Sequence, residues 1–195
     1  MTKPLPIAVF ISGRGSNLQA ILNAIESGLV SAQVKVVISD RPGALGLECA
    51  QKNHIPAYGL DVTSFDSKRD YECEVVRLLH IHGVELVVLA GYMRIVSETL
   101  LQAYLNKIIN IHPSLLPAFK GLHTHERALK LGVKFSGCTV HYVNEGLDEG
   151  QIIAQAVVPV LPSDTVETLS ERVLKEEHRL LPEVIQSIAL DISRR

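Results

Sequence analysis

Residues 7–25, IAVFISGRGSNLQAILNAI, join a short apolar run to a glycine-containing turn and then to a helical pattern. The run from Ile7 to Ile11 has the length and composition of a buried strand, because it lacks the polar alternation of a strand with one wet face. Beyond the turn, apolar residues recur at helical spacing, at Leu18, Ile21, Leu22 and Ile25. A strand followed directly by a helix is the repeating unit of a parallel sheet.

The same alternation continues outward from this stretch. We expect further strands at 34–39, 55–60, 86–90 and 108–112, with helices through 45–50, 67–82 and 97–104. The strand at 86–90 is the most hydrophobic, which predicts a central position. These elements indicate an α/β fold with a mostly parallel, twisted sheet and helices on both of its faces.

The C-terminal half of the chain follows a different pattern. After a helix at 124–131, two strands at 137–143 and 152–160 lie close enough in sequence to form an antiparallel pair. Asp164 and Glu167 have the spacing of a capping box at the start of a last, amphipathic helix.

Length and composition limit the classes of protein that fit. The chain has 195 residues, of which 47% are hydrophobic and 21% charged, so we expect a single domain spanning 1–195. A net charge of −2 argues against binding to nucleic acid. No apolar run is long enough to cross a membrane, and the N-terminus has no cleavage site of the secretory type. The scattered cysteines, Cys49, Cys73 and Cys138, fit free thiols, so we expect a cytoplasmic protein.

The turn at 12–17, Ser-Gly-Arg-Gly-Ser-Asn, lies where ligands bind in open α/β sheets, at the carboxyl end of a strand. Its glycines allow close backbone approach, and the N–H groups of Gly15, Ser16 and Asn17 would point from a helix N-terminus towards an anion such as phosphate. One alternative is a plain turn in which Asn17 caps the helix. Another is a dinucleotide-binding motif in which Asp40 contacts a ribose, but Leu18 replaces the third glycine of that motif.

Asn110 and His112 end the strand at 108–112 and lie two residues apart, so their side chains point to the same side. An amide and a charged imidazole can both donate hydrogen bonds to a carbonyl oxygen that gains negative charge. A carboxylate from the turn that follows the strand at 137–143, Asp148, could stabilise the charged imidazole and collect a proton through a water. A structural role for His112, or simple turn chemistry for Asp148, remains an alternative.

Several histidines lie near these residues in sequence, namely His123, His125 and His141. Together with Asp148 they could in principle hold zinc, but their spacing matches no strong metal motif and no cysteine pair accompanies them. We therefore expect no metal. His141 lies within a strand, which favours a packed, hydrogen-bonded role.

Five segments together resemble the folate-dependent formyltransferases, and in particular the branch that acts on glycinamide ribonucleotide. They are residues 12–17, 91–94 (Gly-Tyr-Met-Arg), 110–117 (Asn-Ile-His-Pro-Ser-Leu-Leu-Pro), 121–125 and 147–150. The resemblance extends from Ile7 to about Pro182. It implies a Rossmann-like formyltransferase fold and transfer of a formyl group from 10-formyltetrahydrofolate to the amine of glycinamide ribonucleotide, in purine synthesis. The implied partners are these two small molecules, with no nucleic acid and no membrane, for a monomer or homodimer.

The resemblance also implies the roles of individual residues. Asn110, His112 and Asp148 match the catalytic residues of the family, and Asn110 also faces the folate. The residues expected to bind the ribonucleotide are Gly15, Ser16, Asn17 and Glu177. Those expected to bind the folate are Lys68, Met93, Arg94, Ile95 and Val96.

Four other functions are less consistent with the sequence. A methionyl-tRNA formyltransferase should carry a basic extra domain, and a formyltetrahydrofolate deformylase an N-terminal regulatory module; we expect neither here. A nucleotide-binding dehydrogenase fails at Leu18 and leaves Asn110 and His112 unexplained. A non-catalytic binding module would make the clustering of Asn, His and Asp at strand ends a coincidence.

Overall fold

The computed structural model describes residues 3–194 as a seven-stranded sheet in the order β3-β2-β1-β4-β5-β6-β7. The strands are β1 Leu5–Ile11, β2 Ala32–Ser39, β3 Ala57–Gly59, β4 Leu86–Leu89, β5 Ile108–His112, β6 Phe135–Tyr142 and β7 Ile152–Pro159. Neighbours from β3 to β5 pair in parallel, whereas β5 with β6 and β6 with β7 pair antiparallel. The predicted α/β fold is confirmed, and β4 is the central strand as predicted.

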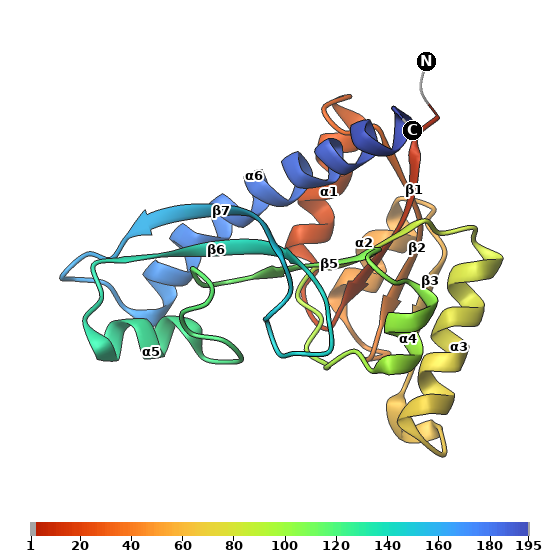
Figure 1. Ribbon diagram of the computed structural model, residues 1–195, viewed down its shortest axis with the longest axis horizontal. Helices are drawn as coiled ribbons and strands as arrows, with labels where there is room; N and C mark the ends of the chain where they lie inside the picture. The colour runs from red at the N-terminus through yellow and green to blue at the C-terminus, as the bar shows by residue number, and fades with distance from the viewer. Residues whose placement is uncertain (1–2, 195) are drawn as a thin grey trace.

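Helices cover both faces of this sheet (Figure 1). They are α1 Ser16–Glu26, α2 Leu45–Lys52, α3 Lys68–Ile81, α4 Glu98–Ala103, α5 Thr124–Leu131 and α6 Val166–Ser193, with a 3-10 turn η1 at Val62–Ser64. The long α6 packs against α1, β6 and β7, while α3 and α4 pack on each other on the opposite face. The two faces thus have separate apolar cores.

The apolar run in β1 is explained by these two cores. Ile7, Val9 and Ile11 pack with α1 and α6, whereas Ala8 and Phe10 pack with α3 and α4. Each position is therefore buried whichever way its side chain points, as in a parallel strand covered on both sides. The edge strand β7 instead has exposed positions along much of its length.

The predicted start of the last helix is wrong in its capping residues. Thr165 is the N-cap of α6, and it forms a reciprocal capping box with Thr168 rather than the one predicted from Asp164 and Glu167. Asp164 instead accepts two hydrogen bonds from Arg172, at 2.7 and 2.8 Å. The carboxylate of Asp164, which the sequence pattern assigned to the cap, is therefore held by an ion pair with Arg172, two turns along the helix.

Candidate active site

The carboxyl ends of β1, β4 and β5 lie side by side at one edge of the sheet, as their pairing requires. Asn110 is opposite His141 of the antiparallel strand β6, and its Nδ2 lies 3.1 Å from Nε2 of that imidazole. His141 Nδ1 is 2.8 Å from the Tyr142 carbonyl oxygen, so Nδ1 carries the hydrogen and Nε2 accepts from Asn110. Within residues 3–194, this is the one hydrogen bond of the Asn110 amide nitrogen, so its second N–H points to no protein acceptor there.

His112 is buried, and both of its ring nitrogens face oxygen atoms. Nε2 lies 3.0 Å from the Phe119 carbonyl oxygen, and Nδ1 lies 3.4 Å from Oδ2 of Asp148. Neither oxygen can donate a hydrogen bond to the ring unless the carboxylate is protonated. The arrangement suits a charged imidazolium that donates on both sides.

Asp148 connects β5 and β6 to the loop that follows β5. Its Oδ1 is 3.8 Å from His141 Nε2, and its Oδ2 accepts a hydrogen bond of 2.8 Å from the Gly121 N–H. Burial lowers the pKa of His141, although the nearby Tyr142 carbonyl and the Asp148 carboxylate oppose this shift. A neutral His141 therefore orients the Asn110 amide, while the carboxylate faces His112.

The glycine turn packs against the start of α2. Gly15 is the N-cap of α1, with φ 77°, and a Cβ atom there would lie 2.7 Å from the Gly46 Cα. The Gly46 N–H donates a 3.0 Å hydrogen bond to the Gly13 carbonyl oxygen. Gly15, Ser16 and Asn17 form the start of α1, and their binding of a phosphate stays a prediction.

The N-cap of α1 is Gly15, so the alternative of a plain turn in which Asn17 caps the helix is wrong. Asn17 Nδ2 donates a 2.8 Å hydrogen bond to Oε2 of Glu177 on α6, and both side chains are buried. Among residues 3–194, the Asn17 Oδ1 atom has no hydrogen-bond partner. Burial raises the pKa of Glu177, and the hydrogen bond from Asn17 partly offsets that shift. The pair is thus a polar site at the base of the glycine turn.

The residues predicted to bind folate are only partly gathered by the structure. Met93 and Ile95 are exposed, but the Val96 side chain packs in the core with α3 and α4, so only its backbone remains for a ligand. The Arg94 guanidinium lies 5.9 Å from the centre of the Tyr71 ring. Lys68 begins α3 three residues before Tyr71, close to the same helix face, and is exposed.

The dinucleotide alternative requires the Asp40 carboxylate at the end of β2 for a ribose, but one of its oxygens is already engaged within the protein. Asp40 accepts a 2.6 Å hydrogen bond from the Ser12 hydroxyl, and that hydroxyl also accepts one of 2.9 Å from the Met93 N–H. The geometry therefore ties this carboxylate to the glycine turn rather than leaving it for a ribose.

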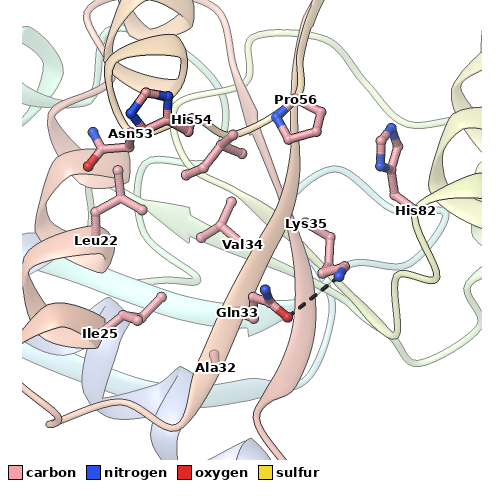
Figure 2. Close-up of a pocket in the computed structure, with 11 residues that line it drawn as sticks. Leu22, Ile25, Ala32, Gln33, Val34, Lys35, Asn53, His54, Pro56 and His82 are labelled. Atoms are coloured by element: carbon pink, nitrogen blue, oxygen red, sulfur yellow. Dashed lines mark hydrogen bonds between the residues drawn. The ribbon is translucent and has the colours of Figure 1, made fainter.

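A surface hollow of about 390 Å³ lies away from these residues. It is lined by side chains from α1, from the first residues of β2 and from the segment after α2, including Leu22, Ile25, Lys35 and His54 (Figure 2). These positions lie at the amino end of β2, whereas the predicted site lies at the carboxyl ends of the strands. Residues 3–194 contain no group of three or more His, Cys, Asp or Glu side chains that could hold a metal ion, and no helix among them could span a membrane.

Comparison with known proteins connects this geometry to a family. The family model for formyl transferase matches residues 5–185. The chain belongs to the formyl transferase family.

Relatives within this family share nearly the full length of the chain. Phosphoribosylglycinamide formyltransferase of Bacillus subtilis is 45% identical, over 93% of this chain and 93% of its own length. The Escherichia coli protein of the same name is 42% identical, over 94% of this chain and 86% of its own. The crystal structure of glycinamide ribonucleotide transformylase 1 from Symbiobacterium toebii superposes with a TM-score of 0.95 at 49% identity, covering 98% of this chain and 90% of that one.

Two features of this formyl transferase site were missed by the sequence analysis. His141 is packed and hydrogen-bonded as expected, but it also contacts Asn110 across the strand pair. The Phe119 carbonyl oxygen lies 3.0 Å from His112 Nε2. Phe119 is a loop residue with φ 56°, and no sequence motif indicates this contact. The alternation of polar residues at 139 and 141 on β6 opposite 112 and 110 on β5 could have indicated His141, given the register.

Proposed function

We propose that the chain transfers the formyl group of 10-formyltetrahydrofolate to the amine of glycinamide ribonucleotide. The observation that carries this proposal is the arrangement of Asn110, His112 and Asp148, with an amide N–H and an imidazole at a strand end and a carboxylate 3.4 Å from the imidazole. The phosphoribosylglycinamide formyltransferases to which the chain is similar support the choice of substrates.

The ribonucleotide would be held at the start of α1. Its phosphate would accept hydrogen bonds from the backbone N–H groups of Gly15, Ser16 and Asn17, where the helix dipole also favours an anion. The buried Asn17 Oδ1 and the Glu177 carboxylate are acceptors at the same place, suited to hydroxyl groups of the ribonucleotide. The folate would lie against residues 93–96, with Lys68 and Arg94 as cations for its carboxylates.

The reaction then needs positioning and charge stabilisation. The amine attacks the formyl carbon, and the carbonyl oxygen becomes an oxyanion that can accept hydrogen bonds from the Asn110 amide and the His112 imidazolium. In the structure the Phe119 carbonyl accepts from His112 Nε2, so the formyl oxygen would take over this hydrogen bond. When the intermediate collapses, the C–N bond to the folate breaks, and the proton lost by the amine ends on that folate nitrogen. The Asp148 carboxylate, 3.4 Å from Nδ1, would stabilise the charge of a protonated His112 and relay this proton through a water.

Matched variants test these roles with purified protein and both substrates. His112→Ala should lower turnover by about 100- to 1,000-fold, the usual effect of removing one oxyanion donor. Asp148→Asn should also lower turnover. The controls are His123→Ala and Glu149→Gln, because both side chains are exposed and pair with Glu126 and Lys120 respectively. Near-normal turnover of a folded His112→Ala protein would exclude this mechanism.

A further inference from the structure

Ser12 is a buried polar residue that the proposed mechanism does not use. It follows the last residue of β1 and directly precedes the glycines of the phosphate loop. Its backbone N–H donates a 3.1 Å hydrogen bond to the Gly91 carbonyl oxygen. Its hydroxyl donates to Asp40 and accepts from the Met93 N–H, as described above. One side chain thus joins the ends of β1 and β2 to the segment that follows β4.

These contacts have a definite direction. A serine hydroxyl has one hydrogen and two lone pairs, and the 2.6 Å hydrogen bond to Asp40 directs that hydrogen away from Met93. The lone pairs are then left for the Met93 N–H at 2.9 Å. Asp40 is half-buried. Burial raises the pKa of the hydroxyls of Tyr71 and Tyr92, and the Asp40 charge adds to this shift; the two hydroxyls hydrogen-bond to each other at 2.8 Å beside Arg94. The Ser12 hydroxyl therefore belongs to a group of polar side chains, with Asp40, Tyr71 and Tyr92, that packs beneath residues 91–94.

We propose that Ser12 is a positioning residue for formyl transfer, which sets the folate-binding segment 91–96 against the phosphate loop 13–17. The inference rests on the function proposed above. The ribonucleotide binds to the loop that begins one residue after Ser12, and the folate to the segment that hydrogen-bonds to it. The distance between amine and formyl carbon thus depends on the contacts of one residue, and small misplacements of reacting groups lower rates strongly.

A positioning role and a merely structural role have different kinetic consequences. In Ser12→Ala the Met93 N–H loses its partner, while the backbone N–H groups of Gly15, Ser16 and Asn17 are untouched. The KM for 10-formyltetrahydrofolate should therefore rise about ten-fold, equivalent to about 1.4 kcal/mol. We expect kcat to fall about 10- to 100-fold from misalignment. The KM for the ribonucleotide should stay within about two-fold of the wild-type value, whereas general loosening of the site would raise both KM values.

Two variants of Asp40 test the same contact without changing Ser12. Asp40→Asn retains an oxygen that accepts from the Ser12 hydroxyl, so its kinetics should resemble those of the wild type. Asp40→Ala frees the hydroxyl to rotate, so it should raise the folate KM selectively, by less than Ser12→Ala does. If Ser12→Ala does not fold, Asp40→Ala decides the question. Parallel rises in both KM values, or wild-type kinetics of the folded Ser12→Ala or Asp40→Ala protein, would overturn the proposal.

Amide hydrogen exchange separates this proposal from the proposed function. A wild-type protein that formed no formylated ribonucleotide would overturn the proposed function. The peptide covering residues 91–96 would still report on Ser12, because the Met93 N–H is protected by the serine hydroxyl in the free protein. Faster exchange there in Ser12→Ala or Asp40→Ala than in Asp40→Asn supports the positioning contact, and equal exchange in all of them overturns it.

Discussion

At the scale of single residues, Glu177 shows a conflict between stability and binding. The carboxylate is buried against the Asn17 amide, and burial raises its pKa above the ordinary value of 4.5. The folded protein therefore holds a proton that the unfolded chain releases, in the interval between 4.5 and the raised value. The contribution of this group to stability is lost as pH rises through that interval. Glu177 thus lowers stability at neutral pH, and the role proposed for it is that of an acceptor for the ribonucleotide.

Glu177→Gln should separate these two effects. Glutamine cannot ionise, and its carbonyl oxygen can still accept from Asn17. The Tm of the variant should match that of the wild type near pH 4 and exceed it near pH 8, whereas the KM for the ribonucleotide should rise. Thermal melts at both pH values and steady-state kinetics check this. Glu176→Gln is the control, because Glu176 pairs with Arg179 at the surface. A lower Tm for Glu177→Gln at pH 8 would contradict the account.

Sequence reasoning reached some residues of the site and not others. Asn110 and His112 could be predicted because the two-residue period of a strand places them on one side, and the strand ends there. His141 could not be assigned to the site, because its contact with Asn110 depends on the register between β5 and β6. The pairing of Asn17 with Glu177 was out of reach for local patterns, since 160 positions separate the two residues.

At the scale of elements, the glycine turn and α1 are tightly built against α2. Ligand access is therefore not the only reason for glycine at position 15. Any side chain there would meet the Gly46 backbone and would also have to adopt a positive φ. Gly13 differs, since no heavy atom lies within 4 Å of the Cβ position there and its φ lies outside the left-handed region.

Alanine at these two positions should distinguish backbone placement from side-chain bulk. Gly15→Ala should lower the Tm and raise the KM for the ribonucleotide about ten-fold or more, equivalent to at least about 1.4 kcal/mol, because the N–H groups at the start of α1 shift. Gly13→Ala should leave the Tm near the wild-type value, and neither change should alter the KM for the folate greatly. Thermal melts and initial rates measure both quantities. An unchanged ribonucleotide KM in Gly15→Ala would remove the turn from the binding site.

The elements themselves followed from the sequence, with errors at their ends. The strand at 108–112 and the helix at 124–131 have the predicted bounds: Pro113 follows the strand, and Gly132 is the C-cap of the helix. Thr165 was missed as a cap because the motif was assigned to the acidic residues beside it. The predicted antiparallel pair is the end of a three-stranded antiparallel part that includes β5, which local spacing could not reveal.

At the scale of the whole molecule, α1 and α6 bring residues from the two ends of the chain together. Asn17 comes from the first strand-helix unit and Glu177 from the last helix, which crosses back over β6 and β7 to reach α1 (Figure 1). This contact therefore joins the first and the last helix of the fold. A single domain, a monomeric or dimeric state and a cytoplasmic location stay predictions.

The most direct test of the account compares the phosphorylated acceptor with the same acceptor lacking its phosphate. Purified protein is supplied with 10-formyltetrahydrofolate and either glycinamide ribonucleotide or its dephosphorylated form, and formylated product is measured at initial rates. Charge-assisted hydrogen bonds each contribute roughly 1.5–3 kcal/mol, so kcat/KM should fall at least about ten-fold without the phosphate. Equal use of the two acceptors, or no formylated product from either, would contradict the account.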